Sequence, residues 1–197
     1  MSFRALMVDV DGVIVIRPDG RRWDADMAAD LGVEPADLQR AFFNVHWPAI
    51  ITGRARIEDC LPAALAEIAP GVTADALIAY WFAKDACLNE PLLDDLAALR
   101  AAGTPLHLAT VQDHRRADYL WTTLGLKARF DGLHHSAAIG HAKPDLAYFH
   151  AVAGRIALPP ADLLLIDDNP QNVEAATRAG WQARLWTGER TLAEVLA

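Results

Sequence analysis

The sequence predicts an α/β fold in which a parallel sheet forms the core. Short apolar runs at 5–8, 105–110 and 162–166 have the length and composition of strands buried on both faces. From residue 89 onward, such runs alternate with helical segments of ten to fifteen residues. Strands that alternate with helices are typical of right-handed βαβ units, and therefore of a parallel sheet.

A helical region separates the first strand from the others. Apolar residues recur at helical spacing in four segments, at 24–31, 35–45, 57–68 and 73–87. Gly32 ends the first segment, and Pro70 with Gly71 separates the last two. We therefore expect an α/β core of residues 1–16 and 89–197, with a small all-helical cap of residues 17–88 inserted after the first strand.

The core elements can be placed from their end signals. Helices are expected at 91–102, 113–124, 144–153 and 170–179, with further strands at 130–134 and 182–186. Asn89 lies two residues before Pro91, and Asn169 lies directly before Pro170. Both pairs are typical of a helix cap followed by a proline in the first turn. Thr191 and Glu194 have the spacing of a capping box and predict a short terminal helix.

Composition narrows the class of protein. The chain has 197 residues, of which 53% are apolar, and a net charge of −8, which argues against binding to nucleic acid or to an anionic membrane. Residues 1–16 lack the features of a signal peptide, and no apolar run is long enough to span a membrane. The two cysteines, Cys60 and Cys87, are expected to be free thiols. We expect a cytoplasmic protein; its oligomeric state is not predicted.

Polar residues follow three of the apolar strands. Asp9 and Asp11 come after the first strand, Thr110 ends the second, and Asp167 with Asp168 follows the run at 162–166. The carboxyl ends of parallel strands lie along one edge of a sheet, where ligands bind. We therefore expect these residues to converge, and Lys143, in a loop before a helix, to join them.

Such a group of acids would destabilise the site unless some of them are protonated or a cation binds. Two carboxylates about 4 Å apart repel by roughly 4 kcal/mol at an effective dielectric constant near 20. The expected ligands are all hard oxygens, which suit Mg²⁺ better than zinc. The positive charge of Lys143 could hold either a phosphate or a nucleophilic carboxylate.

These motifs resemble those of a known family. Asp9-Val-Asp11-Gly12-Val13, Thr110, Lys143-Pro144 and Ile166-Asp167-Asp168-Asn169 are similar, in order and spacing, to the four motifs of the haloacid dehalogenase (HAD) superfamily. The helical region resembles the cap of the helical-cap subgroup by position and helicity. The resemblance implies a Rossmann-like sheet and a phosphatase-like hydrolase.

The resemblance also implies a role for each motif residue. Asp9 would be the nucleophile that forms an aspartyl-phosphate, and Asp11 would protonate the leaving oxygen and then activate water. Thr110 would hydrogen-bond the phosphoryl group and Lys143 would neutralise it. Mg²⁺ would be held by Asp9, the backbone carbonyl of Asp11, Asp168 directly, and Asp167 directly or through water.

The sequence departs from the family pattern at Val111, where many relatives carry Asn, although the Val111 backbone N–H can still bind phosphate. Asp11 favours phosphoryl transfer, because dehalogenases of this superfamily do not keep a second aspartate as acid and base. The expected function is Mg²⁺-dependent hydrolysis of a small phosphorylated metabolite, such as a sugar phosphate or a nucleotide. Alternatives are a phosphomutase, a 2-haloacid dehalogenase and a catalytically weak binding protein.

Two segments have open interpretations. Trp47 and Arg54 lie between cap helices, where a cap would hang over the catalytic edge; each is either a substrate contact or an ordinary packed or surface residue. The segment 112–116 is either a capped, solvated helix start or a contact with the substrate or the cap.

Three histidines lie near Lys143 in the sequence. His134, His135 and His141 are expected in a solvated or hydrogen-bonded loop, in preference to a second metal site. His141 is also a candidate for the rim of the site.

Overall fold

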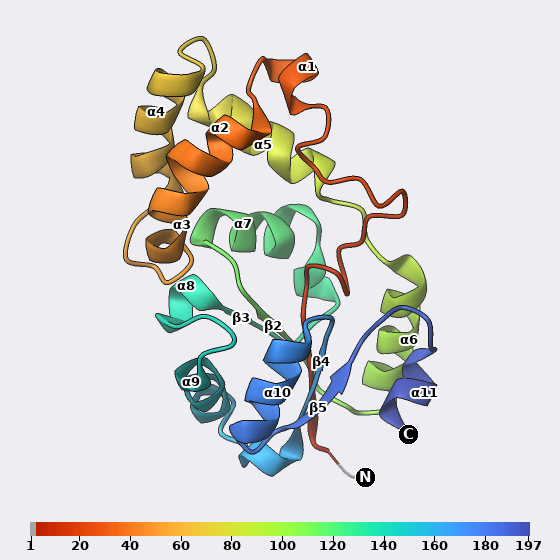
Figure 1. Ribbon diagram of the computed structural model, residues 1–197. Helices are drawn as coiled ribbons and strands as arrows, with labels where there is room; N and C mark the ends of the chain where they lie inside the picture. Colours follow the sequence, from red (N-terminus) through yellow and green to blue (C-terminus); the bar gives the residue numbers. More distant parts are fainter. Residues whose placement is uncertain (1–2) are drawn as a thin grey trace.

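The five strands of the core form one parallel sheet in the order β3-β2-β1-β4-β5. The computed structural model describes residues 3–197, and Figure 1 shows the sheet below a group of helices. The strands are β1 (Ala5–Val8), β2 (Leu106–Thr110), β3 (Gly132–His135), β4 (Leu163–Asp167) and β5 (Gln182–Leu185). The predicted α/β fold with a parallel sheet is confirmed.

The central strand β1 is buried on both faces, which explains its continuous apolar sequence. Its side chains alternate between two clusters: Leu6 and Val8 pack on one face, and Ala5 and Met7 pack on the other. Leu6 lies in register with Leu106 of β2 and Leu164 of β4. The chain builds outward from β1 in both directions, so the β1–β4 border is a switch point, where ligands bind in open α/β sheets.

Helices cover both faces of the sheet. One face is covered by α6 (Glu90–Ala101), the π-helix η2 (Tyr119–Thr123), η3 (Leu126–Ala128) and α11 (Leu192–Leu196). The other face is covered by α9 (Leu146–Ile156) and α10 (Pro170–Arg178). The short elements α7 (His114–Asp118), α8 (Ser136–Ile139) and η4 (Pro160–Asp162) complete the core.

A second group of helices lies beyond the carboxyl ends of the strands (Figure 1). It contains α1 (Met27–Leu31), α2 (Pro35–Leu38), the π-helix η1 (Gln39–Phe43), α3 (Asn44–Ile50), α4 (Ile57–Ile68) and α5 (Ala74–Lys84). These helices share a hydrophobic cluster of their own, with Met27, Phe42, Leu61 and Ile78 among its buried members. The division into domains at 16/17 and 88/89 stays a prediction.

Several element ends differ from those expected. The helix predicted at 35–45 continues through the π-turn to Ile50 and accommodates Pro48. The helix expected from residue 144 begins at Leu146, because the Asp145 side chain accepts a hydrogen bond from the Ala147 N–H and caps it there. The caps predicted at Asn89 and Asn169 and the capping box at Thr191 are confirmed.

The two linkers between the sheet and the helical group run side by side. The Ile16 N–H donates to the Cys87 carbonyl at 2.9 Å, and the Asn89 N–H donates to the Ile14 carbonyl at 2.8 Å. Arg17, on the first linker, binds the Asp85 carboxylate on the second with both Nε and Nη2, at 3.1 and 3.0 Å. The linkers therefore form one paired connection.

Arg116 of α7 joins this connection from the core. Its side chain is buried and donates to the backbone carbonyls of Phe82 and Asp85. The guanidinium also lies over the rings of Phe82 and Tyr119, 5.0 and 5.4 Å from their centroids. A buried charge is tolerated only when it is partnered in this way.

Both cysteines are free thiols, as expected. Between residues 3 and 197, no helix combines the length and the apolar character needed to cross a membrane.

We predict that Arg116→Ala lowers the free energy of unfolding by about 3–5 kcal/mol, because it removes a buried, fully partnered cation. The matched control is Arg115→Ala. Arg115 is half-buried and pairs with the exposed Asp75 at 2.8 Å, so its loss should cost less than about 1 kcal/mol. Urea unfolding of both variants checks the prediction, and equal costs would contradict it.

Candidate active site

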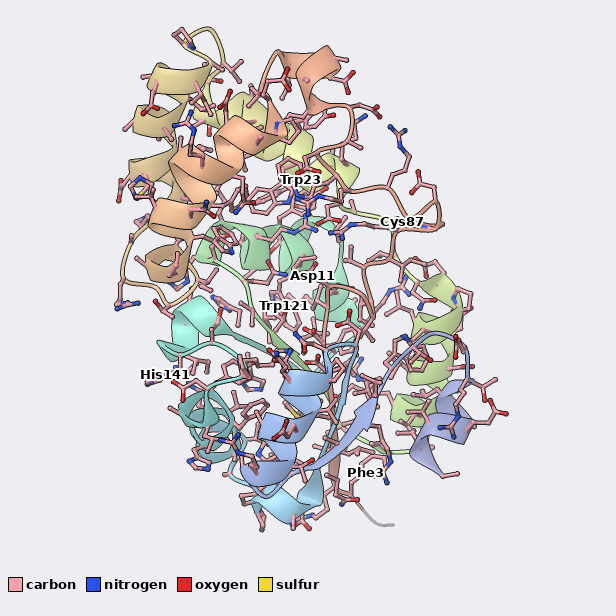
Figure 2. All side chains as sticks on the ribbon, in the orientation of Figure 1. Phe3, Asp11, Trp23, Cys87, Trp121 and His141 are labelled. Atoms are coloured by element: carbon pink, nitrogen blue, oxygen red, sulfur yellow. The ribbon has the colours of Figure 1, made fainter. Side chains whose placement is uncertain are left out.

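The predicted site residues come from four separate parts of the core. Asp9 follows β1, Thr110 ends β2, and Asp167 ends β4 with Asp168 directly after it. Lys143 lies between α8 and α9. In Figure 2, Asp11 lies between the sheet and the helical group, which places this edge under the cap helices.

Lys143 connects two of the acids. Its Nζ lies 2.9 Å from Asp9 Oδ1 and 2.6 Å from Asp167 Oδ2, and its side chain is fully buried. Asp167 Oδ1 also accepts hydrogen bonds from Asn172 Nδ2 at 3.0 Å and from the Asn169 N–H at 2.9 Å. Asp167 is therefore fully partnered and fixes Lys143 beside Asp9.

Asn172 was missed by sequence reasoning. It lies one helical turn after the cap residue Asn169, so that both residues lie on the same side of α10 and face the end of β4. That spacing was the available signal.

Three carboxylates gather at one point of this edge. Asp9, Asp167 and Asp168 each offer an oxygen within 4.8 Å of the others. Burial raises the pKa of Asp9 to about 7, although Lys143 opposes the shift. Partial burial and then Asp167 raise the pKa of Asp168. One lysine does not balance these acids, so a bound cation would stabilise their ionised forms.

Gly12 makes room for the Asp168 carboxylate. Its φ is +79°, and a Cβ at this position would lie 2.1 Å from Asp168 Oδ2. Only glycine avoids both the clash and the strain of the left-handed conformation. The donor set, three hard carboxylate oxygens with Asp168 exposed at the edge, fits Mg²⁺.

Asp11 is held apart from the three-carboxylate cluster. Its Oδ2 accepts a hydrogen bond of 2.6 Å from Gln112 Nε2, and its Oδ1 is buried without a partner among residues 3–197. Burial and then the Asp85 charge raise the pKa of Asp11, while Arg116 and the Gln112 bond oppose them. This is the direction that a proton donor requires.

Thr110 is fully buried, and its Oγ1 has no hydrogen-bond partner in the described part of the chain. An unpaired buried hydroxyl costs free energy. A ligand oxygen at the end of β2 would therefore be a favourable partner. Val111, the next residue, is partly buried.

Trp47 lies inside α3, which corrects its expected place between cap helices, whereas Arg54 lies between α3 and α4 as expected. Trp47 packs against the rings of Phe43 and Trp81, with centroids 5.3 and 5.5 Å apart. Arg54 is exposed and donates to Thr52 Oγ1 at 3.0 Å. Within residues 3–197, neither forms a hydrogen bond or ion pair with the acids, so their contact with substrate stays a prediction.

The loop that carries Arg54 does approach the core. A Cβ on Gly53 would lie 2.3 Å from the carbonyl oxygen of Ala137 in α8. The cap therefore contacts the core both here and at the paired linkers.

The three histidines do not form a metal site together. His134 bonds His107 at 3.3 Å, His135 bonds His114 at 3.1 Å, and His141 bonds Asp145 at 3.1 Å. His134 and His135 belong to β3. The strand expected at 130–134 includes His134, while His135 was expected in a loop and extends that strand. His141 is exposed and lies beside α8 and α9, away from Asp11 (Figure 2).

The segment 112–116 is a capped helix start that contacts the cap, but it is not solvated, because Gln112, Asp113 and Arg116 are buried. Asp113 caps α7 by accepting from the Arg115 N–H at 2.8 Å, while the Arg115 side chain reaches Asp75 in the cap. Gln112, the neighbour of Asp11, was not among the predicted site residues. Its position two residues after Thr110 was the available signal, because alternate residues of an extended segment point to the same side.

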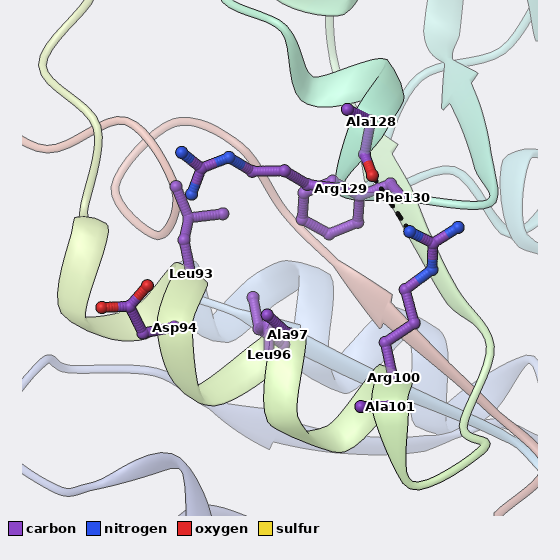
Figure 3. Close-up of a pocket in the computed structure, with 9 residues that line it drawn as sticks. All are labelled: Leu93, Asp94, Leu96, Ala97, Arg100, Ala101, Ala128, Arg129 and Phe130. Carbon is purple, nitrogen blue, oxygen red and sulfur yellow. Dashed lines mark hydrogen bonds between the residues drawn. The ribbon is translucent and has the colours of Figure 1, made fainter.

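A cavity of about 560 Å³ lies elsewhere on the core, between α6 and the segment 128–130 (Figure 3). Arg100 crosses its end and donates to the Ala128 carbonyl at 3.0 Å. None of the motif residues lines it.

With this geometry established, the comparisons with known proteins identify the family. The model of haloacid dehalogenase-like hydrolases matches residues 3–180. The chain belongs to the haloacid dehalogenase-like hydrolase family. It is therefore a hydrolase, and the family expected from the motifs is confirmed.

Two curated relatives are named as phosphatases. The chain is 25% identical over 187 residues to the sesquiterpene phosphatase astK of Aspergillus oryzae, covering 91% of this chain and 87% of that protein. It is 37% identical over 93 residues to the enolase-phosphatase E1 of a Bradyrhizobium strain, covering 44% of this chain and 40% of that protein.

Solved structures share the whole fold. The HAD-family enzyme bt-2542 of Bacteroides thetaiotaomicron, crystallised with magnesium and inorganic phosphate, aligns over 100% of both chains with a TM-score of 0.81 and 16% identity. The L-2-haloacid dehalogenase PA0810 aligns over 93% of this chain and 84% of its own, with a TM-score of 0.63 and 20% identity. At these identities the likeness concerns the fold.

We predict that Gly12→Ala abolishes most of the stabilisation that Mg²⁺ gives, because the new methyl displaces Asp168. In the wild type, a Mg²⁺ concentration 100 times the Kd should add about 2.7 kcal/mol to the free energy of unfolding. Gly20→Ala is the matched control: its φ of +68° causes similar backbone strain, but nothing lies within 4 Å of its Cβ. Thermal unfolding with and without MgCl₂ measures the effect, and a wild-type Mg²⁺ response in Gly12→Ala would refute it.

Proposed function

We propose that this hydrolase cleaves small phosphate monoesters with Mg²⁺, through an aspartyl-phosphate formed on Asp9. The observation that carries the proposal is that Asp9 and Asp11, two residues apart, have different surroundings. Asp9 lies against Lys143 in the three-carboxylate cluster. Asp11 is half-buried outside that cluster, and its Oδ1 has no hydrogen-bond partner among residues 3–197. Relatives named as phosphatases, and a structural neighbour crystallised with magnesium and inorganic phosphate, support it.

In the first step, a carboxylate oxygen of Asp9 attacks the phosphorus atom and forms a P–O bond. The bond from phosphorus to the ester oxygen breaks, and its electron pair stays on that oxygen. The protonated Asp11 donates its proton there, so the alcohol leaves neutral. The Thr110 hydroxyl and the Lys143 ammonium bind the phosphoryl oxygens and stabilise their charge.

In the second step, water attacks the phosphorus atom of the aspartyl-phosphate. Asp11, now ionised, takes a proton from that water, and the bond from phosphorus to the Asp9 oxygen breaks. The electron pair returns to Asp9, which is again a carboxylate, and inorganic phosphate is released. Asp11 regains its proton, so the cycle closes.

Asp9, Asp168, Asp167 and the backbone carbonyl of Asp11 would hold Mg²⁺. When bound, the ion supplies positive charge to the equatorial phosphoryl oxygens and to the Asp9 nucleophile.

Asp11 distinguishes this proposal from the dehalogenase alternative. A dehalogenase releases halide and has no leaving oxygen to protonate, so a second aspartate with a raised pKa would have no task. The likeness to PA0810 concerns the fold and does not favour its reaction. The substrate we propose is a small phosphorylated metabolite, without nucleic acid or membrane partners. We propose that the cap residues Trp47 and Arg54 contact this substrate.

We predict that the purified protein releases phosphate from 4-nitrophenyl phosphate with Mg²⁺ and that EDTA abolishes this activity. Asp9→Asn should reduce kcat by at least about 10⁴-fold, because the amide is not a nucleophile. Asp19→Asn, on an exposed turn, is the matched control and should retain activity.

Undiminished turnover by Asp9→Asn would refute the nucleophile. Isomerised product without free phosphate would indicate a phosphomutase. No activity on a broad panel of phosphate esters, together with no Mg²⁺ binding, would indicate a binding protein, and halide release from a 2-haloacid would indicate a dehalogenase.

A further inference from the structure

Gln112 is the side chain that contacts Asp11 directly. Its Nε2 lies 2.6 Å from Asp11 Oδ2, and Gln112 is only 3% exposed. The contact joins residues 101 positions apart, from the ends of β1 and β2. Within the described chain, it is the one side-chain hydrogen bond that Asp11 makes.

The backbone of Gln112 is itself held by the first residues of α8, which directly follow β3. Its backbone N–H lies 3.0 Å from Ser136 Oγ, and its carbonyl accepts from both Ser136 Oγ and the Ala137 N–H at 3.2 Å. Ser136 is fully buried. These bonds extend the pairing of Thr110 with His135 beyond the strands, so the sheet itself sets the position of the Gln112 side chain.

We propose that Gln112 is a positioning residue that holds the carboxyl group of Asp11 in place for proton transfer. The inference rests on the proposed phosphatase function. The amide N–H donates to Oδ2 at 2.6 Å, while Oδ1 has no hydrogen-bond partner among residues 3–197. The Gln112 bond is therefore the contact that fixes the orientation of this carboxyl group.

This arrangement serves both halves of the reaction. Asp11 gives its proton to the leaving oxygen in the first step and accepts a proton from water in the second. The hydrogen bond from Gln112 holds the carboxyl group in place through both steps. Fixing a proton donor in this way matters, because small displacements of a catalytic group cost large factors in rate.

The test is Gln112→Met, which keeps the side-chain length and removes the amide. Phenyl phosphate and 4-nitrophenyl phosphate are close in shape, but only the phenolate of the first needs much help from an acid to leave. We expect kcat/KM for phenyl phosphate to fall at least about tenfold more than for 4-nitrophenyl phosphate, a part of the 10²–10⁴-fold that a general acid contributes. A merely structural role would lower both by the same factor.

Two controls accompany the test. Gln39→Met, on the exposed surface of the cap, should leave the ratio of the two kcat/KM values unchanged. In an Asp11→Asn background, Gln112→Met should cause no further loss, because Gln112 acts only through Asp11. Unfolding curves of each variant with Mg²⁺ establish that the protein is folded.

Equal losses for the two esters, or losses that add to those of Asp11→Asn, would overturn the role of Gln112 and leave the proposed function standing. A wild-type protein that hydrolyses neither these esters nor a broad panel of others would overturn both.

Discussion

The contact of Lys143 with Asp9 and Asp167 is the constraint on which the rest of the site depends. The ammonium of Lys143 is fully buried, and a buried charge is stable only when oppositely charged or hydrogen-bonding groups contact it. Asp167 fulfils that need and is itself held by the Asn172 side chain at the start of α10. Lys143 therefore fixes the carboxylate of Asp9, the proposed nucleophile. Lys143 is in turn held by Asp167, which Asn172 of α10 binds. With Asp168 added, the acids still outnumber this cation, which is the physical reason to expect Mg²⁺.

A second polar network links the site to the cap. Arg17 and Arg116 meet at Asp85, where the two linkers and α7 come together. The charges of Asp85 and Arg116 act in opposite directions on the pKa of Asp11. Asp11, the proposed acid and base, therefore lies within the electrostatic influence of the connection between cap and core. The cap also approaches the core where Gly53 lies against the Ala137 carbonyl, so the cap meets the core at this loop and at the paired linkers.

The sheet could be predicted from sequence because its three central strands β1, β2 and β4 are short, largely apolar runs that are followed by or end in Asp or Thr. The motif residues followed from one topological rule, that parallel strands end at one edge. Arg116 could not be found in this way, because its partners Phe82 and Asp85 are distant in sequence. Gln112 and Asn172 each carried a local spacing signal, but the topological rule selects residues at strand ends and not the residues that hold them. The extension of the 35–45 helix to Ile50 was also missed. A proline such as Pro48 normally interrupts a helix, but here the packing of the cap keeps it inside α3.

The central claim is the division of labour between Asp9, which attacks, and Asp11, which moves protons. It is tested most directly by mixing Asp11→Asn with 4-nitrophenyl phosphate and Mg²⁺, quenching in acid, and locating phosphate by peptide mass spectrometry. The leaving group needs no proton, whereas hydrolysis of the intermediate needs the base. The account predicts that phosphate accumulates on Asp9 in this variant. A burst of 4-nitrophenol with no phosphorylated Asp9, or phosphate on another residue, would contradict it.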